Sequence, residues 1–286
     1  MRAFAYERPA SLAEAFALLA AHPDGGARLL AGGTDLIIRL RDGTFRPQVV
    51  VDVKDVAELD GRITRDDGRV RFGALTTMTE IVDDAAMARD YPALVEAARF
   101  VGSVQIRNRA TLAGNICNAS PAADTAPSLL VYDAVVVVAG PGGERRIPID
   151  EWFVRSGVTT VAPGEIVTEI ELPAPDGRRG SAFQRRTRRR GHDLASVTLA
   201  CSVSADGMTR LAYGSVGPRP VLAVDRSGVL ADPSAAPEAR TAVLDELLAG
   251  AIPSPTSMRA GPEYRLAMLR ILGMRAVSTA VERLPA

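Results

Sequence analysis

Arg28-Leu-Leu-Ala-Gly-Gly-Thr-Asp-Leu36 is the stretch that organises this chain, and Arg109-Ala-Thr-Leu-Ala-Gly-Asn115 repeats its main features. In the first stretch an apolar run ends at a glycine pair, and a helical pattern begins behind it. Glycine lets the backbone approach a ligand closely, and the start of a helix leaves N–H groups without intrahelical partners. Together the two stretches predict a binding site for an anion such as a diphosphate. Taken alone, a glycine pair after a strand is typical of a plain turn.

The composition is that of an ordinary globular protein. The 286 residues are 47% hydrophobic and 24% charged, and this length favours two domains. The formal net charge is zero, which gives no sign of general attraction to nucleic acid or to membranes. The N-terminus has no signal-peptide core, and no apolar run approaches the roughly 18 residues that span a bilayer. We therefore expect a cytoplasmic protein with no membrane span and no nucleic-acid partner.

Side chains for most kinds of catalysis are scarce. Cys117 and Cys201 are the only cysteines, which are too few for a CxxC zinc site, an iron–sulfur cluster or a disulfide framework. His22, which we expect to end a helix, and His192 are the only histidines, and Lys54 is the only lysine. The motifs of common hydrolases, metalloproteases, P-loop proteins and Rossmann folds are absent. We expect no catalytic or metal-ligating residue, and we expect a redox cofactor to supply the chemistry.

Apolar periodicity and turn residues predict a mixed α+β chain. The turn-rich segment from Pro173 to Gly177 divides it into a domain of residues 1–173, with subdomains of about 1–55 and 56–173, and a domain of residues 178–286. Strands are expected at 28–31 and 49–53, on both sides of the turn Asp66-Asp67-Gly68 within 61–72, and at 131–138, 165–172, 181–188, 194–205 and 211–215. Helices are expected after Ser11, Asp35, Thr77 and Tyr91, and at 237–249 and 262–283.

Two further segments make the pattern specific. With Gln105-Ile-Arg-Asn108 and Ala119-Ser-Pro-Ala-Ala-Asp124, the two glycine-containing stretches resemble the FAD-binding subunit of the xanthine dehydrogenase family. Over nearly the whole chain, the sequence resembles the separate medium subunit of carbon monoxide dehydrogenase and related bacterial molybdenum hydroxylases. The resemblance implies an α+β fold with a two-subdomain FAD-binding domain of the vanillyl-alcohol-oxidase type and a smaller α+β C-terminal domain that closes over the flavin.

The resemblance also implies a set of residues that bind FAD without a covalent bond. Two loops would hold the pyrophosphate, Asp124 the adenosine ribose, and Arg185 the isoalloxazine edge, while apolar residues would lie near the flavin and the adenine. The expected cofactor-binding residues are Arg28, Leu29, Leu30, Ala31, Gly32, Gly33, Thr34, Asp35, Leu36, Val101, Ile106, Ala110, Thr111, Gly114, Asn115, Asp124, Ile166, Val167 and Arg185. Considered without the resemblance, Asp124 is equally a helix N-cap, and the four apolar positions from Val101 to Val167 are core residues.

Arg185 belongs to a basic run that departs from the family pattern. The family has a lysine at this position, two residues after the aromatic Phe183, and a guanidinium would stabilise negative charge at the flavin N1/O2 edge with different geometry. The following segment, Arg186–Arg190, is either a solvated face, a contact with a partner subunit, or a patch for an anionic acceptor. We expect His192 to have no acid–base role.

The resemblance finally implies a function and partners. The chain would be the FAD-binding electron-transfer subunit of a heteromeric molybdenum hydroxylase or dehydrogenase, an oxidoreductase whose substrate is oxidised on another chain. A molybdopterin-binding large subunit and a small subunit with two [2Fe–2S] clusters would complete it, as a dimer of heterotrimers. The external acceptor stays open among NAD, oxygen and quinones. The alternative is a stand-alone flavoprotein oxidoreductase, or a non-catalytic nucleotide-binding module of the same fold.

Overall fold

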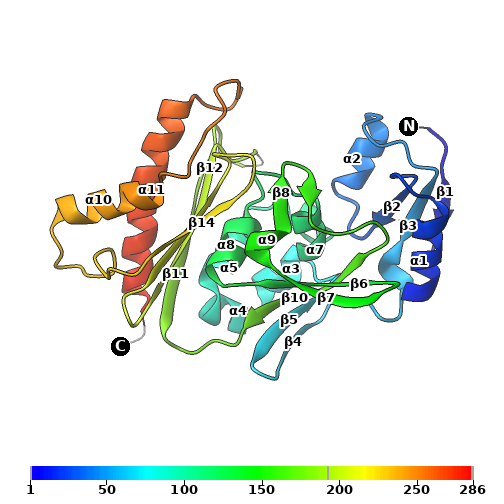
Figure 1. The fold of residues 1–286 in the computed structure, drawn as a ribbon, viewed down its shortest axis with the longest axis horizontal. Helices are drawn as coiled ribbons and strands as arrows, with labels where there is room; N and C mark the ends of the chain where they lie inside the picture. Colours follow the sequence, from blue (N-terminus) through cyan, green and yellow to red (C-terminus); the bar gives the residue numbers. More distant parts are fainter. Residues whose placement is uncertain (1, 192, 285–286) are drawn as a thin grey trace.

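The computed structural model describes residues 2–191 and 193–284, and His192 therefore lies outside the described residues. Three main β-sheets follow one another along the longest axis of the molecule, with helices packed against each of them (Figure 1). The mixed α+β class predicted from the sequence is confirmed. Within the described residues, no helix combines the length and the hydropathy that are needed to cross a bilayer.

The first sheet is parallel and contains the N-terminal part of the chain. Its strands lie in the order β1-β3-β2, and α1 packs beside it. His22 ends α1, as expected. The Ser11 hydroxyl accepts a hydrogen bond from the N–H of Glu14, whereas the Glu14 carboxylate accepts one from the N–H of Ala10, so these two residues form only half of a capping box. The bounds are β1 (Ala5–Glu7), α1 (Leu12–Ala21), β2 (Ala27–Leu30), α2 (Leu36–Arg41), β3 (Val49–Asp52) and the 3₁₀ turn η1 (Val53–Asp55).

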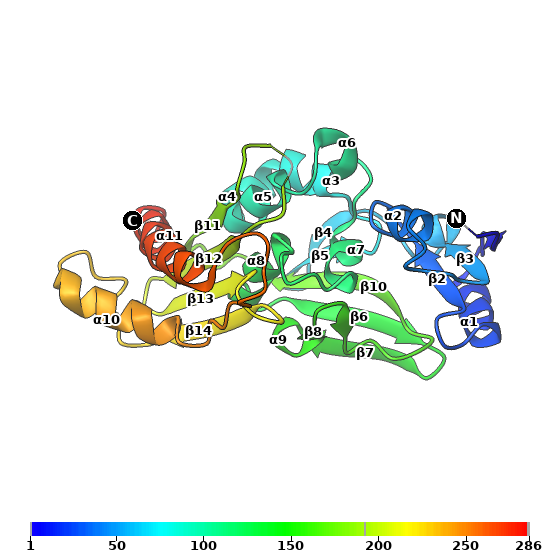
Figure 2. The same cartoon turned by 90° about the horizontal axis from the view of Figure 1, so that it is seen from above.

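The second sheet is antiparallel, with strand order β4-β5-β10-β6-β7, and most of the helices between β5 and β6 gather on one of its faces (Figure 2). The largest hydrophobic core lies between this face and the helices. The strands are β4 (Ile63–Asp66), β5 (Arg69–Gly73), β6 (Val135–Gly140), β7 (Gly143–Pro148) and β10 (Ile166–Pro173), beside a hairpin of β8 (Phe153–Arg155) and β9 (Val158–Thr159). The helices are α3 (Met78–Asp83), α4 (Ala85–Asp90), α5 (Pro92–Arg99), α6 (Val104–Arg107), α7 (Leu112–Cys117), α8 (Thr125–Val131) and α9 (Ile149–Trp152).

The strand expected at residues 131–138 is wrong in its first half. Val131 is the last residue of the buried helix α8, Asp133 has a left-handed backbone with φ 55°, and β6 begins only at Val135. An apolar run of this length does not distinguish a buried strand from a buried helix end followed by a strand. Helix α8 was expected only under the alternative that Asp124 is a helix N-cap, and Asp124 does stand at the N-cap position of this helix.

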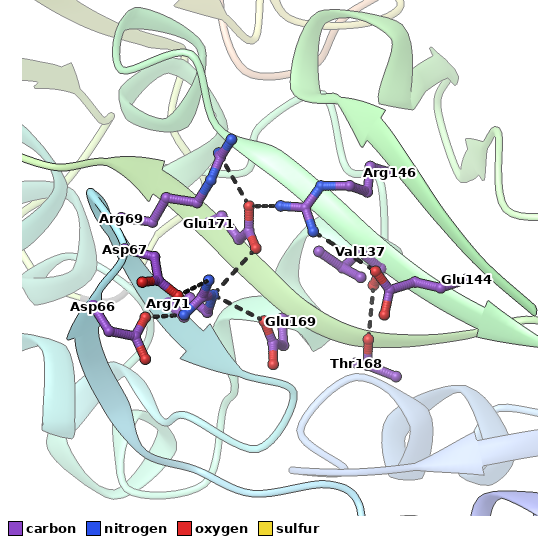
Figure 3. A network of polar contacts seen from close by, with 10 residues as sticks. All are labelled: Asp66, Asp67, Arg69, Arg71, Val137, Glu144, Arg146, Thr168, Glu169 and Glu171. Atoms are coloured by element: carbon purple, nitrogen blue, oxygen red, sulfur yellow. Dashed lines mark hydrogen bonds and ion pairs between the residues drawn. The ribbon is translucent and has the colours of Figure 1, made fainter.

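Figure 3 shows an ion-pair network on the second sheet. Glu171 on β10 is 1% exposed and is surrounded by three guanidinium groups. Its carboxylate lies 3.2 Å from Arg69 and 3.3 Å from Arg71, both on β5, and it also pairs with Arg146 on β7. A buried carboxylate is tolerated only when it is paired in this way. The network therefore ties three strands of the second sheet together by their side chains.

The third sheet is antiparallel, in the order β11-β12-β13-β14, and α11 crosses β11 and β12. Gly180 permits this packing, because a Cβ at that position would lie 1.9 Å from the carbonyl oxygen of Ala280. The three strands predicted here are confirmed with shifted ends, whereas β14 was not predicted. The bounds are β11 (Arg179–Arg186), β12 (Val197–Ser204), β13 (Thr209–Gly214), β14 (Val221–Asp225), α10 (Pro237–Leu247) and α11 (Pro262–Glu282).

Candidate functional site

The two glycine-containing stretches are in direct contact, although they lie far apart in the sequence. A Cβ added to Gly32 would lie 1.9 Å from the carbonyl oxygen of Arg109 and 3.2 Å from the Cα of Ala110. Only a residue without a side chain fits at such a backbone crossing. The first loop, residues 31–36 between β2 and α2, and the second loop, residues 108–111 before α7, therefore form one continuous surface.

The three glycines of this surface have different roles. Gly32 makes room for the second loop rather than for a ligand, which corrects the expectation that both glycines of the pair open space for a bound group. Gly33 has φ +76°, a conformation that L side chains rarely adopt, and a Cβ there would also meet Leu30 at 2.8 Å. Gly114 is exposed, and a Cβ on it would meet only the Thr111 hydroxyl. Gly114 is thus the glycine whose open side can accept a ligand.

Side-chain hydrogen bonds fix the position of the two loops relative to each other. Asn118, which ends α7, accepts a bond of 2.7 Å from Arg39 on α2 and donates one of 3.2 Å to Asp35. The chemistry of the partners fixes the orientation of the amide, because a guanidinium only donates and a carboxylate only accepts. Neither Arg39 nor Asn118 was singled out from the sequence, since the pairing of two polar residues across a fold leaves no local pattern.

The first loop supplies most of the free backbone donors. The N–H groups from Gly32 to Leu36 donate to no other group among the described residues. At the start of α7, by contrast, the Leu112 N–H donates to the carbonyl oxygen of Thr76, and the Gly114 N–H donates to the Thr111 hydroxyl at 3.0 Å. Helices α2 and α7 have six residues each, so the N–H groups matter more here than a helix dipole. The surface is therefore suited to an anion that accepts several hydrogen bonds.

Two cations lie beside the first loop without a carboxylate in ion-pair distance among the described residues. The guanidinium carbons of Arg28 and Arg39 lie 4.2 Å and 5.0 Å from the centre of the Phe45 ring. Burial and the charge of Arg39 both lower the pKa of Arg28, and its Nε is buried without a hydrogen-bond partner. A bound anion would relieve this like-charge repulsion.

Asp124 contacts Arg185 across the junction of the second and third sheets. Asp124 stands at the N-cap position of α8 but makes no capping hydrogen bond, so the alternative that its side chain caps this helix is wrong. Its Oδ1 lies 3.1 Å from Nε of Arg185 on β11, and the two side chains are 9% and 8% exposed. Burial raises the pKa of Asp124 to about 7, and the Arg185 guanidinium opposes this shift.

This contact bears on the roles that the resemblance gives to the two residues. The adenosine ribose and the isoalloxazine edge lie at opposite ends of FAD. Side chains that touch each other cannot hold opposite ends of an extended dinucleotide. While the pair persists, Asp124 and Arg185 therefore face the same part of a ligand.

The remaining expected residues surround the loops or belong to the cores. Leu29 and Ala31 pack against the core of the first sheet, and the half-buried Val101 and Ile106 pack against the core of the second. Ile166 and Val167 are 3% and 7% exposed, so each has a packing role in one of these cores. Thr34 lies in the first loop and is partly exposed. Asn115 follows Gly114 on α7 and accepts a hydrogen bond from Thr125 at 2.7 Å.

The basic run after Arg185 lies on the surface. Arg186 donates to the Tyr264 hydroxyl at 2.8 Å, and Arg188 forms an ion pair of 3.3 Å with Asp193. Arg186, Arg188 and Arg190 are exposed, as a solvated face requires. Within residues 2–191 and 193–284, His, Cys, Asp and Glu side chains form no group of three or more that could hold a metal ion.

Two protein-family models match the chain on either side of the passage from β10 to β11. Residues 2–175 match the FAD binding domain in molybdopterin dehydrogenase. Residues 182–280 match the CO dehydrogenase flavoprotein C-terminal domain.

Individual relatives match over almost their entire length. The xanthine dehydrogenase FAD-binding subunit of Escherichia coli O157:H7 is 34% identical over 96% of this chain and 95% of that protein. The solved structure of carbon monoxide dehydrogenase from Hydrogenophaga pseudoflava, in a form that lacks the Mo-pyranopterin moiety of its cofactor, has a TM-score of 0.91 at 29% identity over 99% of both chains. Quinoline 2-oxidoreductase from Pseudomonas putida 86 has a TM-score of 0.86 at 27% identity over 98% of both chains. The chain therefore belongs to the xanthine dehydrogenase and carbon monoxide dehydrogenase family of molybdenum hydroxylases, as a FAD-binding medium subunit.

Proposed function

We propose that this chain carries electrons from iron–sulfur clusters on a partner subunit to an external acceptor. The observation that carries the proposal is the contact between the first and second loops, which presents unpaired N–H groups on the surface of a FAD-binding domain. FAD, when bound, supplies exchange of one or two electrons, which no side chain of this chain provides. Substrate oxidation then takes place on another subunit.

The residues of the candidate site fit FAD. The free N–H groups from Gly32 to Leu36 and the open side of Gly114 suit its diphosphate. At the junction of the second and third sheets, Asp124 Oδ1 and Arg185 Nε are buried without a hydrogen bond of good geometry, so both atoms retain capacity for a polar ligand. We propose that the loops hold the diphosphate and that Val101, Ile106 and Arg185 lie toward the flavin, with Ile166 and Val167 toward the adenine.

The proposed partners are a molybdopterin-binding large subunit and a small subunit with [2Fe–2S] clusters. The two similar solved structures named above are carbon monoxide dehydrogenase, in a form that lacks the Mo-pyranopterin moiety of its molybdenum cofactor, and quinoline 2-oxidoreductase. Two cysteines cannot ligate two such clusters, because each cluster takes four protein ligands. The proposed clusters would therefore be held by another chain.

Two measurements test this proposal. The purified chain should bind close to one FAD per chain, and acid precipitation should release all of the flavin into the supernatant, because no covalent bond holds it. A correctly folded chain that takes up no FAD at high concentration would overturn the proposal. Purification from the native host should bring molybdenum and iron with the chain. A flavin-bearing chain that elutes alone, free of both metals, would support the stand-alone flavoprotein instead.

A further inference from the structure

The Asp124–Arg185 contact joins the segment that matches the FAD-binding domain to the segment that matches the C-terminal domain. Asp124 stands at the N-cap position of α8, a helix that packs mainly against β12 and β13 of the third sheet, and Arg185 lies near the end of β11 in the same sheet. Both side chains are more than nine-tenths buried, and they approach within 3.1 Å. A second Asp–Arg pair, Asp133 with Arg210, spans the same junction, and there the carboxylate is about half exposed. The two pairs therefore differ in burial.

Arg185 is held in one place by several acceptors. Its two terminal nitrogens donate to the main-chain carbonyl oxygens of Asp193 and, at 3.4 Å, of Phe100. Its guanidinium carbon lies 5.3 Å from the centre of the ring of Phe100, the residue before Val101. A guanidinium fixed on an aromatic face, with its hydrogens directed to main-chain groups, loses little freedom when it meets a ligand.

Asp124 has no other use among the described residues. Among the described residues, its side chain makes no capping hydrogen bond, its Oδ1 accepts no hydrogen bond of good geometry, and Arg185 is the only residue whose charge acts on it appreciably. Burying a carboxylate is unfavourable unless a cation compensates it. The carboxylate is also too enclosed to bind two ribose hydroxyls while Arg185 covers it. These observations direct its role toward Arg185 rather than toward a ribose.

We propose that Asp124 is a positioning residue for Arg185, and that the two side chains act on FAD as one unit rather than as two separate ligand groups. The inference rests on the proposed function, since it requires FAD in the site. Asp124 fixes the place and the direction of the guanidinium, and the guanidinium is the group that meets the flavin. Removing the carboxylate then has the same consequence for FAD as removing the guanidinium.

A double-mutant cycle on the full-length chain tests the unit. FAD affinity is measured by quenching of flavin fluorescence for the wild type, Asp124→Asn, Arg185→Gln and the double variant. Each single change should weaken binding by about tenfold or more, the scale of one charge-assisted hydrogen bond, and the double variant should bind no more weakly than the weaker single variant. Effects that multiply in the double variant would overturn the inference, because they would show two independent ligands.

The midpoint potential of the bound flavin separates positioning from a simple charge effect. If Asp124 acted only through its negative charge, Asp124→Asn would raise the potential. If Asp124 positions the cation, Asp124→Asn should lower the midpoint potential of the flavin toward the value found for Arg185→Gln. Arg185→Lys keeps a positive charge and should have a potential between those of Arg185→Gln and the wild type. A raised potential in Asp124→Asn would contradict the proposal.

Two controls keep the outcome interpretable. Asp133→Asn removes the other carboxylate at the same junction and should leave both the FAD affinity and the potential unchanged. The double variant buries no charge, so it reports on FAD binding even where a single variant fails to fold. If the wild-type chain binds no FAD, the proposed function is wrong, and this inference fails with it. If the wild-type chain binds FAD but the two substitutions weaken binding independently, only the inference is wrong.

Discussion

The Cα of Gly32 faces the carbonyl oxygen of Arg109 so closely that a Cβ would lie 1.9 Å from this oxygen. Both groups are backbone, so neither can yield without moving its loop. The contact makes the two separate turns into one surface. A substitution at Gly32 therefore tests the contact between the two loops, and it affects ligand binding only through that contact.

Gly32→Ala should separate the two loops. Overpacking of this kind costs about 1–3 kcal/mol of stability, and FAD affinity should fall by about tenfold or more because the donors of the first loop no longer face the second. Thermal unfolding of the FAD-free chain and FAD titration measure the two effects. Gly142→Ala is the matched control, since a Cβ there meets nothing within 4 Å. Wild-type FAD affinity in Gly32→Ala would argue against the loop assignment.

Gly114→Ala should weaken FAD binding while it changes the stability of the chain only slightly. The new methyl group meets only the Thr111 hydroxyl, which caps α7, so loss of this cap limits the cost to about 1 kcal/mol. Because the open side of Gly114 is where the diphosphate is proposed to lie, FAD affinity should fall while the fold is retained. Circular dichroism together with a flavin titration gives both results. Unchanged flavin binding would place the diphosphate elsewhere.

Asn118→Ala should loosen the register of the two loops. The variant removes the amide that accepts from Arg39 and donates to Asp35, and each lost hydrogen bond of this kind is worth about 0.5–1.5 kcal/mol, or more with a charged partner. We expect a weaker FAD complex and a lower melting temperature. Ser204→Ala, which removes a side-chain bond to Asp206 at a hairpin of the third sheet, is the control and should bind FAD normally. Equal FAD affinities in the two variants would contradict the role given to Asn118.

Glu171→Gln should destabilise the second sheet without any effect on FAD binding. The change leaves Arg69, Arg71 and Arg146 around a neutral amide (Figure 3), and breaking a buried charge network by removing one partner costs about 3–5 kcal/mol. Glu144→Gln, which removes an exposed partner of Arg146 at 3.6 Å, should change stability by only about 0–1 kcal/mol. Similar melting temperatures for the two variants would show that the buried network contributes little.

Asp124 should make the stability of the FAD-free chain depend on pH. Its pKa is about 7 in the folded chain against 3.8 for an ordinary aspartate, so between these values the folded chain binds more protons than the unfolded chain. The stability that this group contributes is therefore greatest below about pH 4 and falls as the pH rises toward 7, with a slope of at most about 1.4 kcal/mol per pH unit. Above pH 7 its contribution no longer changes with pH.

The comparison with Asp124→Asn isolates this effect, because the other titrating groups cancel in the difference between the two chains. Asp193, the other carboxylate beside Arg185, has its pKa lowered by the hydrogen bond from Arg188, so it titrates below this range. The free energy of unfolding of the wild type minus that of Asp124→Asn should fall from pH 4.5 to pH 7 and then become constant. A difference that stays constant across this range would contradict the raised pKa.

Local patterns predicted those elements whose signals are contained in a few neighbouring residues. Pro237 and Pro262 mark the first positions of α10 and α11, and both terminal helices are found where the sequence indicates them. The edge strand β7 was missed, because its Glu144, Arg145 and Arg146 are exposed and lack the apolar alternation of a half-buried strand. The end of α8 was missed because an apolar run carries no sign of where a helix gives way to a strand.

The site was predicted in its parts but not in its assembly. The small residues of both loops stand out in the sequence, and the resemblance to a family places them together. The closeness of Gly32 to Arg109, the bridge through Asn118 and the pairing of Asp124 with Arg185 depend on how distant segments pack, which no local pattern records. That Arg28 and Arg39 have no carboxylate within ion-pair distance among the described residues is likewise a property of the fold, because the sequence does not show which charges come together.

The most direct test of the central claim is a crystal structure of this chain with FAD bound. The diphosphate should lie between the two loops, with its oxygens within hydrogen-bond distance of N–H groups between Gly32 and Leu36 and against the open side of Gly114. A diphosphate bound at any other surface, with the first loop free of ligand, would contradict the account.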